Sequence, residues 1–266
     1  MADANRDTLK RTFDSDAELY DKARPNYPDE IIDDLVVLGA LEPGATVLEI
    51  GCGTGKATLA LAKRGLRVVC VEIGENLAAV ARRNLAQYTG VEVLTSPFES
   101  WEPRGQLFDM ALAATSWHWI DPEVRYQRTA QSLKPRGVLA ILDGGGHAFP
   151  EGFDPFFTEI QKTYEALGEP HLEWPPPSPE RAPDRVEEIE RSGLFSVAGI
   201  KRYVWAVDYA ADSYIDVLNT YSGHIAWPQW KRDRLYAEVR ELIGERAEKR
   251  IRKHYLSILH ICRRIS

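Results

Sequence analysis

Cysteine and methionine are scarce in this 266-residue sequence, which contains three cysteines and two methionines. Cys52, Cys70 and Cys262 are odd in number and show no paired spacing, which argues against a disulfide framework. We expect each cysteine to lie in a buried loop or strand. We therefore expect a reduced, cytoplasmic protein.

Long apolar runs and an excess of basic residues are also missing. No run approaches the roughly 20 apolar residues of a membrane-spanning helix, and the polar residues 1–16 lack the apolar segment of a signal peptide. With 33 Lys and Arg against 40 Asp and Glu, the formal net charge is −7. A long contact with nucleic acid needs clustered Lys and Arg, so we expect neither a membrane nor a nucleic acid as a partner.

One glycine-rich loop stands out against this background. Residues 47–50 (VLEI) have the composition of a buried strand, residues 51–55 (GCGTG) carry glycine at every second position, and a helical segment follows. Such glycines permit positive φ angles and close approach of the backbone to a ligand. A second apolar run, 68–71, ends in Glu72, and a carboxylate at this place can bind the two hydroxyls of a ribose. These residues predict a nucleoside-containing ligand at the carboxyl ends of a parallel sheet.

Two common nucleotide-binding motifs do not fit this loop. The NAD fingerprint needs glycine at its first, third and sixth positions, and the sixth position counted from Gly51 is Lys56. The phosphate-binding loop G-x-x-x-x-G-K-[ST] would need a glycine at Ile50 and a hydroxyl at Ala57. The pattern that remains is E-x-G-x-G-x-G at 49–55, followed by a distant glutamate.

This pattern resembles the first motif of class I S-adenosylmethionine-dependent methyltransferases, and three further segments are similar to the same family. Y-x-x-x-R-P-x-Y-P at 20–28 resembles a segment that precedes the glycine loop in a small-molecule branch. H-W-x-D at 118–121 resembles the trans-aconitate and ubiquinone-pathway methyltransferases. LKPRG at 133–137 resembles the turn before the fifth strand, with Arg136 in place of a glycine. The resemblance is strongest over residues 13–142, about half of the chain.

The resemblance implies S-adenosylmethionine as the cofactor, with S-adenosylhomocysteine as its product. The residues that it places around the cofactor are Glu49, Gly51, Gly53, Glu72, Ile73, Ser96, Pro97, Phe98, Ala114, Thr115, Tyr20 and Arg24. In this set Glu72 would bind the ribose and Ile73 would lie on the adenine. Ser96 departs from the pattern, because many relatives have an acidic residue there.

Apolar runs alternate with helical segments through the first half of the chain, which predicts parallel strands with helices on both faces. With two later strands this gives an α/β fold, a Rossmann-like, doubly wound, seven-stranded and mostly parallel sheet with helical lid and cap insertions. We expect the strands at 46–50, 67–72, 91–95, 108–114, 137–142, 195–207 and 254–262. In the first half, after the N-terminal lid, we expect helices at 56–64, 76–87 and 122–133.

We interpret the chain as a single domain, 1–266. Residues 1–40 would form an N-terminal helical lid, and residues 41–143 the cofactor-binding half. The glycines at 144–146 would end the fifth strand in a turn. The segments 144–183 and 208–244 would be cap insertions, and 254–262 would form the last strand.

The two cap insertions are expected to cover the pocket of the methyl acceptor. We expect helices in the second half of the chain near 153–167, 183–192, 212–222 and 228–243, and an extended proline-rich loop at 169–179. The aromatic residues that we expect the cap to contribute are Phe153, Phe156, Phe157, Trp174, Tyr209, Tyr214, Tyr221, Trp227 and Trp230.

His118 is the candidate catalytic residue, because it follows the fourth strand at the functional end of the sheet. It is either a general base for a hydroxyl or amine acceptor or a structural imidazole between two tryptophans, and a carboxylate acceptor needs no base. The histidines show no metal-ligand spacing, so we expect no catalytic metal. The predicted reaction is methyl transfer to the oxygen, nitrogen or carboxylate of a small-molecule acceptor. The alternatives are a cofactor-binding protein and an RNA or protein methyltransferase, and the oligomeric state does not follow from these residues.

Overall fold

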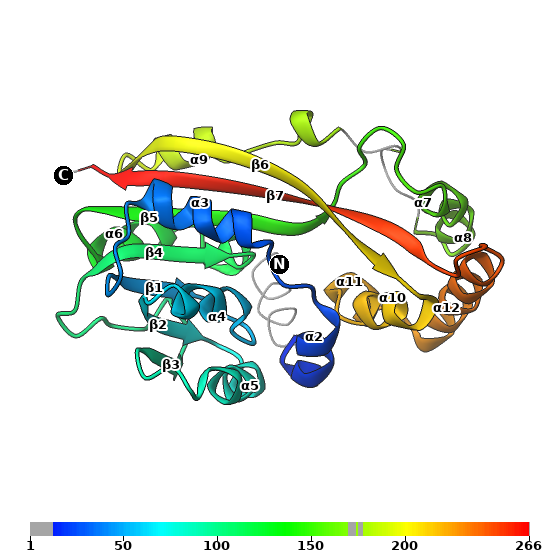
Figure 1. The fold of residues 1–266 in the computed structure, drawn as a ribbon, viewed down its shortest axis with the longest axis horizontal. Helices are drawn as coiled ribbons and strands as arrows, with labels where there is room; N and C mark the ends of the chain where they lie inside the picture. The colour runs from blue at the N-terminus through cyan, green and yellow to red at the C-terminus, as the bar shows by residue number, and fades with distance from the viewer. Residues whose placement is uncertain (1–12, 170–173, 175–177, 266) are drawn as a thin grey trace.

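The computed structural model describes residues 13–169, 174 and 178–265. Its framework is a seven-stranded sheet in the order β3-β2-β1-β4-β5-β7-β6 (Figure 1). Five strands, β1 to β5, run parallel, and β7 pairs antiparallel with both β5 and β6. The predicted α/β fold with a mostly parallel sheet is therefore confirmed. The strands are β1 (Thr46–Ile50), β2 (Arg67–Glu72), β3 (Val91–Thr95), β4 (Phe108–Ala114), β5 (Leu133–His147), β6 (Phe195–Tyr209) and β7 (Ile251–Arg264).

The strand order reverses between β1 and β4. From β1 the chain proceeds outward through β2 to β3, and it then returns to place β4 on the other side of β1. At such a switch point the loops after two neighbouring strands turn to opposite faces, which leaves a crevice beyond their carboxyl ends. The glycine loop follows β1 directly, so this crevice is where a ligand of the loop must lie.

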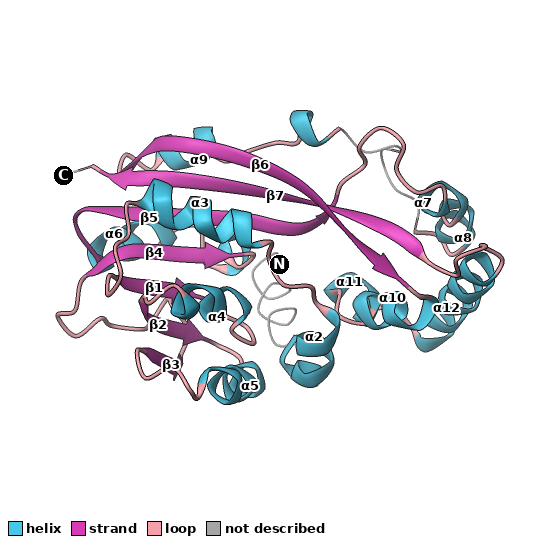
Figure 2. Cartoon of the chain, viewed as in Figure 1, coloured by secondary structure: helices cyan, strands magenta, loops and turns pink. Residues whose placement is uncertain are grey.

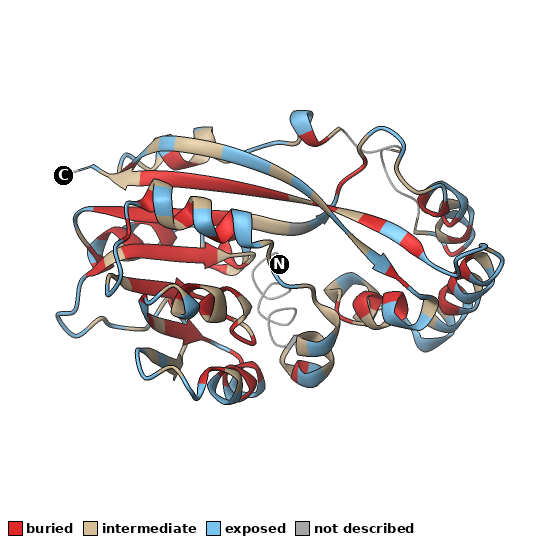
Figure 3. Cartoon of the chain, viewed as in Figure 1, coloured by how far each residue is buried: buried red, intermediate tan, exposed pale blue. Residues whose placement is uncertain are grey.

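Helices cover both faces of the sheet (Figure 2). Apolar residues of α3, α4 and α5 pack on one face, and those of α6 and α9 pack on the other. Leu48 in β1 and Leu139 in β5 are fully buried, as expected for strands covered on both faces (Figure 3). The helices of the sheet layers are α3 (Asp29–Gly39), α4 (Lys56–Lys63), α5 (Glu75–Leu85), α6 (Arg125–Ser132) and α9 (Val186–Arg191).

The predicted glycine turn at 144–146 is wrong, because β5 continues to His147. A register shift between Asp143 and Gly146 marks an irregularity in this stretch, and Gly146 pairs with Leu256 of β7. β7, the antiparallel partner of β5, is long enough to form hydrogen bonds with β5 beyond the point where the parallel strands end. Glycine therefore marks a bulge here and not the end of the strand.

The cap is a separate helical cluster built on the far ends of β6 and β7 (Figure 1). The predicted helix 153–167 is divided into α7 and α8. The predicted helix 212–222 ends early, because α10 stops at Leu218 and α11 begins only at Ser222. Residues 170–173 and 175–177 of the predicted proline-rich loop lie outside the described residues. The helices of the cap are α7 (Phe156–Glu159), α8 (Gln161–Ala166), α10 (Ala211–Leu218), α11 (Ser222–Ile225) and α12 (Gln229–Gly244).

The N-terminal helix α2 (Ala17–Ala23) lies between the sheet layer and the cap, next to α5 and α10 (Figure 1). Glu18 pairs with Arg83 of α5, with the oxygen and nitrogen 2.5 Å apart, and Lys22 pairs with Asp216 of α10 at 2.9 Å. Both pairs are largely exposed to solvent, so each adds little to stability. Buried Ala17 of α2 also packs with Leu77 and Val80 of α5, so a small apolar contact holds the helix across the crevice together with these ion pairs. Residues 1–12 of the predicted lid lie outside the described part of the chain.

Candidate functional site

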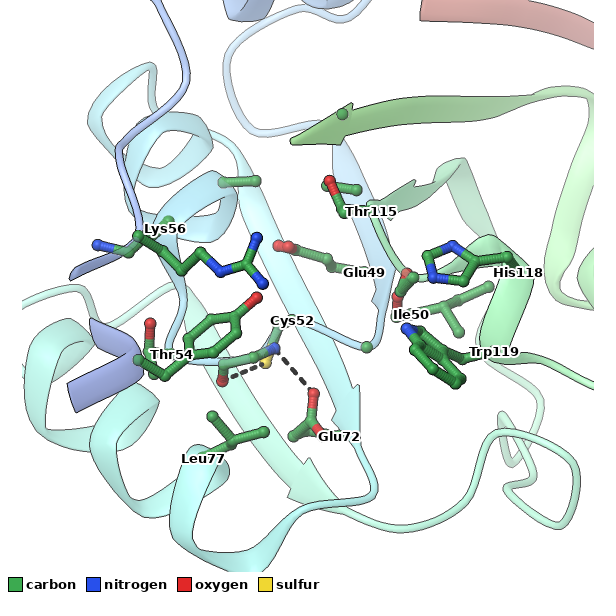
Figure 4. A pocket seen from close by; sticks show the side chains of 18 of the residues that line it. Glu49, Ile50, Cys52, Thr54, Lys56, Glu72, Leu77, Thr115, His118 and Trp119 are labelled. Atoms are coloured by element: carbon green, nitrogen blue, oxygen red, sulfur yellow. Dashed lines mark hydrogen bonds between the residues drawn. The ribbon is translucent and has the colours of Figure 1, made fainter. Parts of the chain in front are cut away.

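A cavity of about 400 Å³ lies at the carboxyl ends of β1, β2 and β4 (Figure 4). All the site residues predicted from the sequence line it except Pro97. Figure 4 shows Glu72 and His118 on different sides of this space. The structure thus gathers side chains from the N-terminal segment, the glycine loop and three strands around one space.

The glycine loop turns tightly at the floor of the cavity. Gly51, Gly53 and Gly55 all have positive φ angles, of 70°, 56° and 86°. A Cβ atom on Gly51 would lie 2.7 Å from the Cβ of Ser116, and one on Gly55 would lie 2.8 Å from Leu85. The positive φ angles favour glycine at all three positions, and the lack of space for a Cβ atom also requires it at Gly51 and Gly55. Above Gly53, by contrast, the nearest atom to such a Cβ is in the Tyr20 ring, at 3.8 Å.

Two carboxylates are buried at this end of the sheet. Glu49 is 1% exposed and accepts a hydrogen bond of 2.6 Å from the Thr58 hydroxyl. Burial raises the pKa of Glu49 to about 8, and the nearby Glu72 also raises it. Glu72 is 4% exposed, accepts hydrogen bonds of 2.8 Å from the amides of Gly53 and Gly74, and has its pKa raised mainly by burial. With a pKa of about 8, Glu49 is mostly protonated at pH 7, and a cation bound beside it would favour its charged form.

The opposite wall of the cavity follows β4. Thr115 has a positive φ of 61° and its hydroxyl lies 2.7 Å from that of Tyr27, which comes from the segment after α2. The Ser116 hydroxyl donates to the carbonyl of Ile50 in β1. The Ser116 bond joins the ends of β1 and β4, and the Tyr27 contact joins the N-terminal segment to β4. Ser116 was missing from the sequence-based site because a serine after a strand carries no recognisable signal.

The side of the cavity that follows the ends of β2 and β3 is lined by Ile73, Ser96 and Phe98. Ile73 is 38% exposed, whereas Phe98 is 5% exposed and packs in the core below. The Ser96 hydroxyl donates to the carbonyl of Pro97 at 3.1 Å. This side therefore offers one exposed apolar surface and one hydroxyl whose hydrogen already has an acceptor.

His118 stands at the rim of the cavity in the short helix η2 (Trp117–Trp119). It also lines a side cavity of about 250 Å³ that includes Asp143. Its ring centroid is 4.8 Å from that of Trp119, and among the described residues no group forms a hydrogen bond with the imidazole. Although its surface is exposed to the cavity, the surrounding protein atoms lower the pKa of His118 by desolvation, against the opposing effect of Asp143. The imidazole is therefore neutral at pH 7 and able to accept a proton.

The cavity extends toward the cap, but the aromatic residues there differ from those predicted. Tyr221 lines it as expected, whereas Phe156 is fully buried inside the cap and Trp230 is 62% exposed. Trp205 and Tyr255 line the cavity instead, and their stacked rings have centroids 4.6 Å apart. They are directly paired residues of β6 and β7, so their position depends on a strand register that the sequence does not reveal.

Nowhere in 13–169, 174 and 178–265 do three or more His, Cys, Asp or Glu side chains form a group that could hold a metal ion. Within the same ranges, no helix has the length and apolar character needed to cross a membrane.

Comparisons with known proteins agree with this geometry. Residues 47–137, which include β1 to β4 and the glycine loop, match a family model described as a methyltransferase domain. An uncharacterised methyltransferase of Mycobacterium tuberculosis is 34% identical over 138 residues, which are 52% of this chain and 54% of that protein. A malonyl-[acyl-carrier protein] O-methyltransferase of Geobacter sulfurreducens is 29% identical over 154 residues, 57% of this chain and 54% of that protein. The chain thus spans about half the length of these curated relatives.

The fold is shared more widely than the sequence. The structure of a proposed type II methyltransferase from Anaeromyxobacter dehalogenans has a TM-score of 0.60 and 23% identity, and the match covers 90% of this chain and 97% of that one. An N-methyltransferase of Haemonchus contortus, solved with S-adenosylhomocysteine, has a TM-score of 0.51 and 19% identity, with coverage of 93% and 57%. Residues 47–137 thus match a methyltransferase domain, and the chain shares its fold with solved methyltransferase structures.

Proposed function

We propose that the protein transfers the methyl group of S-adenosylmethionine to a small-molecule acceptor that binds under the cap. The observation that carries this proposal is the continuity of the cavity. One space reaches from the glycine loop and Glu72 to His118 and on to Trp205 and Tyr255 of the long β6–β7 pair. A cofactor and an acceptor can meet in such a space with protein on several sides, which favours a small acceptor over a macromolecule.

The residues of the inner end suit this cofactor. S-adenosylmethionine carries a sulfonium and an ammonium group, and the buried Glu49 and Glu72 favour positive charge. Glu72 already accepts one hydrogen bond on each oxygen, and each carboxylate oxygen can accept a second one, from a ribose hydroxyl. The exposed surface of Ile73 is available for the adenine ring.

When bound, the cofactor supplies an activated methyl group on a sulfonium. The protein's part is then to bind, orient and exclude water. Glu49, Gly51 and Gly53 hold the inner end, and Ala114 and Thr115 form the opposite wall. If the acceptor loses a proton, neutral His118 at the rim is placed to take it.

The helix α2 and the segment after it serve as a lid in this proposal. Tyr20 and Arg24 line the cavity, and the Lys56 ammonium donates to the carbonyl of Asp21 at 2.8 Å. Opening would cost little at the exposed ion pairs to α5 and α10, but it would also separate buried Ala17 from Leu77 and Val80. Its closure over the cofactor would shield the reacting groups from water.

The proposed function is tested by the fate of a labelled methyl group. The protein is incubated with S-adenosylmethionine, labelled on its methyl, and an extract of the source organism that is then separated by ultrafiltration. We expect label in the small-molecule fraction and in a product that boiled protein does not form. Label confined to protein or RNA would contradict the proposal and favour a macromolecular acceptor.

Glu72→Ala tests the cofactor end. We expect it to weaken the binding of S-adenosylhomocysteine by about 1–3 kcal/mol, because it removes hydrogen bonds to a buried carboxylate. Calorimetry on protein with an unchanged circular dichroism spectrum measures the effect. Glu75→Gln, an exposed acid at the start of α5, is the matched control and should bind as the wild type does. Unchanged affinity in Glu72→Ala, or tight binding of NAD instead, would remove this residue from the site.

The lid is tested by hydrogen exchange. Because closure would hold α2 in place, amide exchange across residues 17–24 should slow when S-adenosylhomocysteine is added. Helix α12 (Gln229–Gly244) lies in the cap beyond the cavity lining and serves as the internal control, with exchange that does not change. Equal exchange across 17–24 with and without the ligand would show that α2 is a fixed part of the fold.

His118→Gln tests the proton acceptor once a substrate is known. If His118 is a base, we expect turnover to fall by about 10²–10⁴-fold with little change in the affinity for S-adenosylhomocysteine. A base must be deprotonated, and the pKa of His118 is lowered from its usual 6.5. Wild-type turnover should therefore rise with pH below that value and stay level above it, and the variant should lack the rise. His254→Gln is the control. If His118→Gln turns over as fast as the wild type, His118 is a structural residue and not a base.

A further inference from the structure

Two stacked aromatic rings line the cap end of the cavity. The ring centroids of Trp205 in β6 and Tyr255 in β7 lie 4.6 Å apart, with an angle of 18° between the ring planes. The Lys253 Nζ lies 3.8 Å from the centroid of the Tyr255 ring. One ring face has no room for both an indole and an amine at these distances, so both faces of Tyr255 are covered. Trp205, which is half-buried and lines the cavity, is therefore the member of the pair that can offer a ring face to a ligand.

The polar atoms of these two rings are already bound within the protein. The Trp205 Nε1 donates to the Ser257 hydroxyl at 3.1 Å, and the Tyr255 hydroxyl lies 2.7 Å from that of Tyr209. The hydrogen bond and the stacking together fix the orientation of the indole. What the pair presents to the cavity is therefore apolar ring surface in one orientation, which suits a flat apolar group.

The indole of Trp205 also lies close to the wall that borders the cofactor end. A Cβ atom on Gly144, which lines the cavity, would lie 3.4 Å from the Ser257 hydroxyl oxygen and 3.2 Å from that of Thr115. The hydroxyl that accepts from the indole and the hydroxyl of Thr115 thus border the same small space, and glycine leaves that space open. A ring stacked on Trp205 would accordingly lie next to the part of the cavity that we assign to the cofactor.

The charged groups of the cavity disfavour a cationic ligand at this end. The acids among the described lining residues are Glu49, Glu72 and Glu99. They belong to β1, to the end of β2 and to the segment after β3, which is the inner end of the cavity. At the cap end the nearest charge is positive, because the Arg24 guanidinium lies 4.4 Å from the centroid of the Tyr221 ring. An ammonium group stacked on Trp205 would have no counter-ion among the described lining residues there, whereas an uncharged ring needs none.

We propose that the methyl acceptor carries a planar, uncharged aromatic ring that stacks on Trp205. This inference rests on the proposed function and names the chemical class of its substrate. Aromatic pairs gain more free energy than the burial of their apolar area gives alone, and a saturated ring of the same size does not obtain this gain. Trp205 is then a residue that determines specificity, because it favours flat rings over puckered ones.

Matched pairs of probes test the inference on the full chain saturated with S-adenosylhomocysteine. Benzyl alcohol is compared with cyclohexylmethanol, and 2-phenylethanol with 2-cyclohexylethanol, so that each pair shares its hydroxyl group and differs in the aromaticity of its ring. Calorimetry or ligand-observed NMR measures the dissociation constants. We expect each aromatic alcohol to bind about three- to tenfold more tightly than its saturated partner. Trp205→Leu should bring this ratio to one or below, whereas Trp230→Leu, which removes a 62% exposed tryptophan of α12, should leave it unchanged.

A second readout reports on the Trp205 ring itself. The protein is labelled with 5-fluorotryptophan, and the Trp205 fluorine signal is identified by its loss in Trp205→Phe. The ring current of a stacked aromatic probe acts directly on the indole, so the aromatic probes should shift this signal by much more than the saturated probes do. The measurement uses the wild-type fold, so it decides the matter even if Trp205→Leu fails to fold.

The outcomes separate this inference from the proposed function. Equal binding of the aromatic and saturated probes, no binding of either at millimolar concentration, or an unmoved Trp205 signal would overturn the inference while the binding of S-adenosylhomocysteine stands. An undiminished ratio in folded Trp205→Leu would also overturn it, because another ring would then hold the probe. If S-adenosylhomocysteine itself does not bind, the proposed function fails, and this inference fails with it.

Discussion

The burial of two carboxylates on neighbouring parallel strands constrains the rest of the site. Glu49 in β1 and Glu72 at the end of β2 are held by strands that are hydrogen-bonded to each other, so they cannot move apart, and their proximity contributes to the raised pKa of Glu49. Each side chain accepts hydrogen bonds from different donors. Glu49 accepts one from the Thr58 hydroxyl, and Glu72 accepts two from the backbone amides of Gly53 and Gly74. The shape of the glycine loop thus depends on Glu72 as much as on its glycines. A cationic ligand would supply the positive charge that the protein itself does not place beside these two carboxyl groups.

The other end of the cavity depends on the long pairing of β6 with β7. This pair extends beyond the parallel sheet, and its far part carries the cap helices as well as Trp205 and Tyr255. The same two strands therefore belong to the core and to the acceptor side. A change in their twist or register would move the acceptor wall relative to the glycine loop, and the distance between cofactor and acceptor would change with it.

Local signals in the sequence were enough for the inner half of the molecule. The strand at 46–50, the glycine loop and Glu72 lie close together in the chain. Their sequence pattern is specific enough to predict both their structure and their ligand. The outer half depends on contacts between distant residues. Trp205 and Tyr255 face the cavity only because of the antiparallel register of β6 and β7, which no local pattern specifies. The glycines at 144–146 were misassigned for the same reason, since the partner that continues β5 lies more than a hundred residues later.

The position of β7 inside the sheet also affects the order in which the molecule can be built. β7 is synthesised after β6 and after the cap helices, yet it lies between β5 and β6. While a ribosome is still producing the cap, β5 has an unpaired edge and β6 has no neighbour in the sheet. Such an edge of buried, apolar residues is a site for aggregation until its partner arrives. The nascent chain therefore completes its seven-stranded sheet only when β7 inserts between β5 and β6. The part of the cavity formed by β6 and β7, unlike the glycine loop, is among the last parts to form.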